Sequence, residues 1–277
     1  MNQLNLFSVI DNKIGDRYSK FVLPFIAFPL LRKQNVVVEV RLSHADEFIE
    51  KNKQALAFMN ERWPEKFLVA KIDTPHWNTL PCGSATRFIQ KPKLEAKWTK
   101  ICDVDIMHLD EGLFEHFESL ESKYGEDKVY FALKRPELKK LSGTLCVKTR
   151  DFYTSAWEQH LNDYLQEIEK EDKFRKKIPP FDQPHYYHTE YVNWDIVTPV
   201  HGEPFNAEGA NEEIRPIQGI HISLNRPAYA PPWQPDRPDW EITDERKKVW
   251  RALRETDDYK KVAKFFDPEM IELLDQI

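Results

Sequence analysis

The sequence is poor in cysteine and contains no long apolar run, and each shortage excludes a class of protein. Its 277 residues include 3 cysteines, Cys82, Cys102 and Cys146, whose spacing matches no common metal-binding pattern. We therefore expect buried thiols in a reducing cytoplasm rather than a disulfide framework. The longest apolar stretch, residues 21–31, contains two prolines and is too short to cross a bilayer. Residues 1–10 lack the basic and apolar segments of a secretory signal peptide, so we expect none.

A strong excess of one charge is also missing. The chain carries 40 Lys and Arg and 46 Asp and Glu, a formal net charge of −6, and the two signs are well mixed. Because there is no basic stripe, we do not expect a nucleic-acid partner, and because there is no block of like charge, we expect no charged tail. The length is sufficient for one large α/β domain or two small ones with a sizeable core.

Strand and helix patterns alternate in the first half of the chain. Short apolar runs rich in β-branched residues predict strands, and a wider apolar periodicity predicts helices. The predicted strands are residues 4–10, 36–42, 67–72 and 98–102, and the predicted helices are residues 18–33, interrupted by Pro24 and Pro29, 45–62, capped by Ser43, 84–90 and 106–120. This alternation predicts an α/β fold with a mostly parallel central sheet, right-handed crossovers and flanking helices.

The second half of the chain has a different pattern. The sequence contains 19 prolines against 8 glycines, and most of the prolines follow Lys177, which predicts long ordered loops. We expect strands at residues 128–133, 144–149, 191–197 and 217–222, and helices at 151–177, capped by Asp151, 243–256 and 259–276. One compact domain with a loop-rich, helical C-terminal portion is the simplest arrangement.

The most informative motif is Asp103-Val104-Asp105, which directly follows the predicted strand at residues 98–102. In open α/β sheets, ligands bind at the carboxyl ends of the strands. Two carboxylates at positions i and i+2 of an extended turn can point the same way and bind one divalent cation. Mg²⁺ and Mn²⁺ favour such oxygen ligands and keep open positions for substrate phosphates. The alternative is an acidic turn that is simply solvated.

Further polar residues occur in a fixed order around this acidic pair. Asp11 and Asn12 follow the first predicted strand, and Arg87 lies on the short helix before the pair. His221 belongs to the late predicted strand, in Gly219-Ile220-His221-Ile222, and Arg226-Pro227 follow it. Between them lie two short motifs, Leu141-Ser142-Gly143-Thr144-Leu145 and Phe181-Asp182-Gln183.

This order of motifs resembles the nucleotide-sugar-dependent glycosyltransferases with a GT-A fold, which is Rossmann-like. The resemblance is greatest to the family-8 type, which includes bacterial galactosyltransferases and glycogenin. It extends over roughly residues 4–233 as short motifs in order. It implies a GT-A domain at residues 1–240, with a nucleotide-sugar half at about 1–125 and an acceptor half at about 126–240, and a helical extension at 241–277.

The resemblance implies a role for each of these residues. Asp103, Asp105 and His221 would hold Mn²⁺ or Mg²⁺ against the two phosphates of the donor, and the habit of the family implies a UDP-sugar as that donor. Asp182 and Gln183 would act at the sugar, with Gln183 near the anomeric carbon of an oxocarbenium-like transition state. The remaining donor-binding residues would be Asp11, Asn12, Arg87, Ser142, Gly143 and Arg226. The resemblance alone implies retention of the anomeric configuration.

Departures from the family pattern keep other functions open. The family's Asn-x-Gly motif reads Leu-Ser-Gly at residues 141–143, and Arg226 replaces a lysine one position early. The second hypothesis is therefore a non-catalytic GT-A-like module that binds a nucleotide or a protein. A third, a nucleotidyltransferase, is disfavoured because only Gly15 lies in the turn after the first predicted strand, where such enzymes carry a glycine-rich loop.

Each candidate residue also has a structural interpretation. Arg87 is compatible with a surface ion pair, His221 with a half-buried strand, Asp11 with an Asx turn, and Asp182-Gln183 with the start of a helix. A rival cluster, His185-Tyr186-Tyr187-His188-Thr189-Glu190, has two histidines and a glutamate that are compatible with zinc. It lacks the His-Glu-x-x-His order, and its aromatic content favours a packing or acceptor-binding segment.

Overall fold

The computed structural model describes residues 3–11, 16–74, 77, 85–127, 129–135, 140–171, 185–202, 219–222, 243–275 and 277. Within these ranges, six strands form a central sheet in the order β3-β2-β1-β4-β7-β6. The first four strands along the chain are mutually parallel, whereas β7 is antiparallel to both β4 and β6. The expected α/β fold with a mostly parallel sheet is thus confirmed. The strand bounds are β1 (Leu4–Ile10), β2 (Val36–Leu42), β3 (Phe67–Lys71), β4 (Trp98–Ile101), β6 (Tyr130–Arg135) and β7 (Lys140–Lys148).

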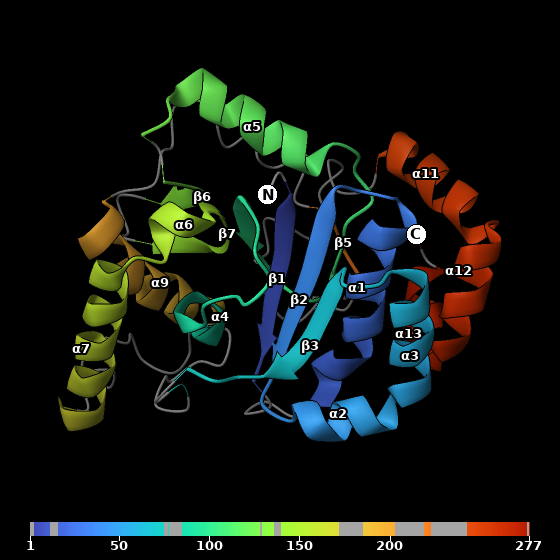
Figure 1. Cartoon of the computed structure of the whole chain (residues 1–277), viewed down its shortest axis with the longest axis horizontal. Coiled ribbons are helices and arrows are strands. Elements are labelled where there is room, and N and C mark those ends of the chain that lie inside the picture. Colours follow the sequence, from blue (N-terminus) through green and yellow to red (C-terminus); the bar gives the residue numbers. More distant parts are fainter. Residues whose placement is uncertain are drawn as a thin grey trace, which may run out of the picture.

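Both faces of the sheet are covered by helices, as expected for parallel strands. Alternate residues of β1 point to opposite faces, so Leu4 and Leu6 belong to one core cluster and Phe7 and Val9 to another. Figure 1 shows the helices grouped on the two sides of the sheet. The first group includes α1 (Val22–Leu31), α3 (Lys53–Arg62) and the C-terminal helices, and the second includes α4 (Thr86–Ile89), α6 (Thr149–Phe152), α7 (Ser155–Glu171) and α9 (His185–His201).

The C-terminal helices pack on α1 and share its core cluster. They are α11 (Asp244–Arg254), α12 (Asp257–Val262), η7 (Ala263–Phe265) and α13 (Pro268–Leu274). The ring of Phe28 on α1 meets Trp250 edge-on, with ring centroids 5.6 Å apart, and lies 6.0 Å from Phe266. Thr243 and Thr256 cap α11 and α12 with their side chains, close to the predicted starts of two helices. The helix predicted at 259–276 is divided, because η7 ends at Phe265 and the Asp267 side chain caps α13 by accepting from the Glu269 amide.

One predicted helix is partly wrong. Residues 106–120 were expected to be helical throughout, but Ile106–Met107 form a short strand, β5, and α5 (Leu113–Tyr124) begins only at Leu113. β5 pairs with β8 (Ile220–His221) in a separate two-stranded sheet. Its two residues are buried in the core, so this distant pairing overrides the local helical pattern.

The strand predicted at residues 191–197 is wrong, because these residues belong to α9. Their β-branched content suggested a strand, but Val192, Ile196 and Val197 are buried with the spacing of one helix face. The helix α9 packs on β7, where the Asn193 side chain donates to the Leu141 carbonyl at 3.4 Å. Burial against the sheet thus outweighs strand propensity.

Other predicted helices are correct in type but interrupted. Residues 18–33 divide into η2 (Asp16–Phe21) and α1. Residues 45–62 divide at Asn52 into α2 (Ala45–Lys51) and α3, and the N-cap residue of α2 is His44 rather than Ser43. In the 151–177 region, Thr154 rather than Asp151 caps the long helix α7, accepting from the Trp157 amide at 3.2 Å.

Two further expectations concern thiols and membranes. Cys102 and Cys146 are free and buried, as predicted, whereas Cys82 lies outside the described residues. None of the helices in the described ranges combines the length and the apolar character needed to cross a membrane.

Phe28 offers a test of the packing between α1 and the C-terminal helices. Because its ring is fully buried between Trp250 and Phe266, we expect Phe28→Ala to lower the free energy of unfolding by about 3–5 kcal/mol. The measurement is urea denaturation followed by tryptophan fluorescence and circular dichroism. Phe265→Ala, at a partly buried phenylalanine of η7, is the matched control and should lower it less. Equal losses in the two variants would contradict this packing.

Candidate functional site

The acidic pair lies at the point where the strand order of the sheet changes direction. From β1 the chain adds β2 and then β3 on one side, and it returns to place β4 on the other side of β1. The carboxyl ends of β1 and β4 therefore border a topological switch point, where open α/β sheets bind ligands. Asp11 directly follows β1, and Asp103 follows β4 after Cys102, whose amide still bonds to the Phe7 carbonyl at 3.0 Å. In Figure 1 this is the lower edge of the sheet, toward which β1 to β3 point.

Arg87 and Asp103 form an ion pair at this edge. Arg87 Nη1 on α4 donates to Asp103 Oδ1, and the two side chains are 6% and 37% exposed. The whole of α4 is buried, so the guanidinium is held in place by its helix as well as by the carboxylate. Arg87 Nε has no hydrogen-bond partner within the described part of the chain. The site thus contains a desolvated cation with an unused donor beside a more exposed carboxylate.

The small sheet brings the backbones of Asp105 and His221 close together. Ile106 of β5 pairs with His221 of β8, and the Ile222 amide donates to the Asp105 carbonyl at 2.7 Å. The Asp105 side chain is buried, and His221 is half-buried. The backbone neighbourhood of these two residues is therefore fixed although they are far apart in the sequence.

The connection that follows β5 is anchored by the end of α1. Arg32 Nε donates to the Leu109 carbonyl at 3.2 Å, and Gln34 Nε2 donates to the His108 carbonyl at 3.3 Å. Arg32 also forms an ion pair with Glu111. These bonds satisfy carbonyls in a segment without regular structure and so restrict the positions of β5 and of Asp105.

The remaining predicted residues are only partly described. Ser142 and Gly143 lie on β7, ahead of Leu145, which pairs with Ile101. Because β7 is antiparallel to β4, their backbone lies at the same edge of the sheet as Asp103. The predicted residues outside the described ranges are Asn12, Asp182, Gln183 and Arg226. The rival zinc residues His185, His188 and Glu190 lie in the first turns of α9.

The metal site of Asp103, Asp105 and His221 stays a prediction. Within the ranges that the structure describes, no three His, Cys, Asp or Glu side chains come together as a group suited to a metal ion. The Asp103 carboxylate instead binds the Arg87 guanidinium. The chemistry of the three side chains suits Mn²⁺ or Mg²⁺, and we derive no step through a metal.

Buried titratable groups lie next to the acidic pair. Burial lowers the pKa of Lys100 and, well below its usual 6.5, that of His108. Burial also raises the pKa of the Cys102 thiol to about 12, and its Sγ lies 3.7 Å from His108 Nε2. Cys102 is therefore a neutral thiol and a poor nucleophile, which argues against thiolate chemistry at this site.

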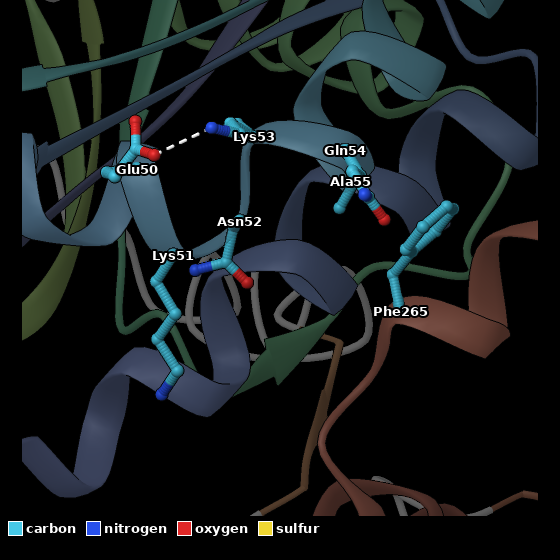
Figure 2. A pocket seen from close by; sticks show the side chains of 7 residues that line it. All are labelled: Glu50, Lys51, Asn52, Lys53, Gln54, Ala55 and Phe265. Atoms are coloured by element: carbon cyan, nitrogen blue, oxygen red, sulfur yellow. Dashed lines mark hydrogen bonds and ion pairs between the residues drawn. The ribbon is translucent and has the colours of Figure 1, made fainter.

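A hollow at the junction of α2 and α3 contains none of the predicted site residues (Figure 2). It is lined by Glu50, Lys51, Asn52, Lys53, Gln54, Ala55 and Phe265. Glu50 and Lys53 form an ion pair there at 2.7 Å, and both side chains are mostly exposed. Long, exposed side chains of this kind do not define a ligand geometry, and we assign this hollow no function.

Comparison with known proteins does not assign the chain to a family: no family model matches it, and no curated protein sequence matches it significantly. The functional argument therefore rests on the fold and on the geometry at the carboxyl ends of β1 and β4.

The sequence analysis missed Asp110 and Arg246, which connect the segment after β5 to α11. Arg246 binds both carboxylate oxygens of Asp110 at 2.7 Å. An acidic residue in a loop and an arginine in the first turn of a distant helix give no local signal that they pair.

The burial of His108 predicts a pH dependence of stability. Its pKa in the folded protein is well below 6.5, the value of an exposed histidine. As the pH falls below 6.5, the unfolded chain therefore gains a proton that the folded chain does not, and the free energy of unfolding decreases. We expect His108→Gln to reduce the slope of this decrease between pH 7 and pH 5 in urea denaturation.

His201 affects stability in the same direction, because burial lowers its pKa to about 4. The free energy of unfolding of the wild type should therefore depend on pH through both histidines. Replacing His108 alone should flatten the slope in part. An unchanged slope in a folded His108→Gln variant would show that this imidazole is not held neutral.

Proposed function

We propose that the protein is a GT-A-like glycosyltransferase that moves a sugar from a nucleotide-diphosphate sugar, with a UDP-sugar as the first candidate, to a hydroxyl-bearing acceptor such as a glycan. The observation that carries the proposal is the pairing of Arg87 with Asp103 at the switch point between β1 and β4. A buried cation and acidic side chains at that position suit a ligand with a diphosphate and polar hydroxyl groups.

The arrangement of the strands supports this proposal. A nucleotide bound across the switch point would place its base or ribose near Asp11 and its phosphates toward the end of β4. Asp11 is a polar side chain at a strand end, where it can accept hydrogen bonds from a base or a ribose. Arg87 can present two donors to a phosphate, which makes it a stronger phosphate ligand than a lysine.

The roles assigned to the other residues follow from the family resemblance. Asp182 and Gln183 are proposed to act at the donor sugar, and Asn12, Ser142, Gly143 and Arg226 to bind the donor. Mn²⁺ or Mg²⁺ is the proposed cofactor, with Asp103, Asp105 and His221 as its ligands, and when bound it would neutralise charge on the diphosphate. Retention of the anomeric configuration is proposed on the same basis.

A non-catalytic module that binds a nucleotide or a protein is the second candidate. One observation in its favour is the ion pair that neutralises Asp103. Another is that no three of the described side chains are grouped as ligands of a metal ion. The two candidates differ in whether a bound nucleotide sugar is turned over, since both allow the nucleotide itself to bind.

Nucleotide binding provides the first test. We expect isothermal titration calorimetry with UDP, GDP and their sugars to detect binding of one nucleotide that strengthens in the presence of Mn²⁺. Asp105→Asn should weaken that binding at least tenfold, because a carboxylate beside the phosphates would be lost. The matched control is Asp258→Asn, which changes a surface carboxylate of α12 that pairs with Arg62 of α3. This variant should bind the nucleotide as the wild type does.

Turnover separates the two candidates. Release of free nucleotide from the bound nucleotide sugar, with or without an added glycan acceptor, supports the transferase. Binding without any release supports the non-catalytic module. If no nucleotide or nucleotide sugar binds with either metal, both forms of the proposal are wrong.

A further inference from the structure

The strand that carries His221 is short and has few pairing interactions of its own. β8 contains two residues, which pair with the two residues of β5. The Ile222 amide adds one more bond, to the Asp105 carbonyl. An isolated pair of strands this short is not stable by itself. Other contacts must therefore fix where β8 lies against β5.

Gly219 allows the chain to approach β5 closely just before β8 begins. Its φ is +86°, a conformation that residues with a side chain rarely adopt. A Cβ atom at this position would lie 2.6 Å from the Met107 carbonyl oxygen and 2.7 Å from Cγ2 of Ile106. It would also lie 3.3 Å from Nδ1 of the buried His108. A side chain at residue 219 would therefore push β8 away from β5.

Arg246 connects the start of β8 to the segment that follows β5. Its Nε and Nη2 each donate to the Asp110 carboxylate at 2.7 Å, and its Nη1 lies 3.5 Å from the Gly219 carbonyl oxygen. Both side chains of the ion pair are largely buried. A planar guanidinium that binds a carboxylate through two donors has a fixed orientation. The direction of its third contact, with the Gly219 carbonyl, is therefore fixed as well.

The helix that carries Arg246 is itself firmly placed. Thr243 accepts a hydrogen bond from the Arg246 amide and so caps the first turn of α11. Further along the helix, Trp250 and Leu253 are buried in the core cluster that contains α1. Arg246 therefore transmits the position of the core to the two-stranded sheet.

We infer that Arg246 and Asp110 are positioning residues for His221 and for the neighbouring Asp105. The inference rests on the proposed function in so far as these two residues belong to a nucleotide-sugar site. The Arg246–Asp110 pair and the close approach at Gly219 together fix β8 against β5, and thereby the side chain of His221 relative to the acidic pair. The C-terminal helix α11 is then part of the support of the site.

The first test does not depend on a ligand. The ring resonances of the histidines are recorded by NMR at constant pH, and His221 is identified by its loss in His221→Gln. We expect Arg246→Gln to shift the His221 ring resonances. Arg254→Gln removes the same charge from the same helix, where Arg254 pairs with the exposed Asp275, and should leave them in place. A folded Arg246→Gln variant with unshifted His221 resonances would overturn the inference, whether or not the protein binds nucleotides.

The second test asks whether Arg246 acts through His221. We expect Arg246→Gln to weaken Mn²⁺-dependent UDP binding at least fivefold in the wild type and less than twofold in the His221→Gln background, because coupled residues are non-additive. Equal weakening in the two backgrounds would show that Arg246 acts independently of His221. If the wild type binds no nucleotide, the proposed function fails, and the NMR test alone decides the inference.

A substitution at Gly219, on the β8 side of the contact with Arg246, provides a test that does not require Arg246→Gln to fold. If Arg246→Gln does not fold, Gly219→Ala displaces β8 while leaving the Arg246–Asp110 pair intact. It should shift the same His221 resonances, and unshifted resonances in the folded variant would contradict the inference.

Discussion

β1 is hydrogen-bonded along both edges and buried on both faces, and the location of the candidate site depends on this constraint. A strand in this position is mostly apolar on both sides, as Leu4, Leu6 and Phe7 are, and its polar residues Asn5 and Ser8 are buried as well. Because β2 and β3 occupy one side of β1, the next parallel strand, β4, takes the other edge. The resulting change of direction places Asp11 and Asp103 at adjoining strand ends.

Buried charges also fix the irregular connection that leads into β4. Glu39 and Arg41, on the same face of β2, form a fully buried ion pair at 2.6 Å. Glu39 Oε2 also accepts hydrogen bonds from the backbone amides of Lys93 and Leu94, both at 2.8 Å. Loss of either charge would leave the other buried and uncompensated, which is strongly destabilising. The segment between α4 and β4, and with it the spacing of Arg87 and Asp103, is therefore held by polar contacts rather than by apolar packing.

The sequence allowed most of the sheet to be predicted, because buried parallel strands leave a local apolar pattern. β1 and β2 were predicted with their observed bounds, and the acidic pair was correctly placed after β4. Prediction failed at β5 and α9, where partners distant in the chain decide the structure: His221 pairs with Ile106, and α9 packs on β7. A local pattern does not contain that information.

In the candidate site, too, contacts between distant parts of the chain could not be predicted from the sequence. The pairing of Arg87 with Asp103 joins neighbouring segments of the chain, whereas Asp110 and Arg246 are 136 residues apart. The helix that carries Arg246 is placed by its packing on α1, where Trp250 contacts Phe28. The inferred support of His221 by Arg246 therefore includes a C-terminal helix. It follows that the geometry of this site and the stability of the core are linked through one helix, so that changes in the packing of α11 act on the site without touching the acidic pair.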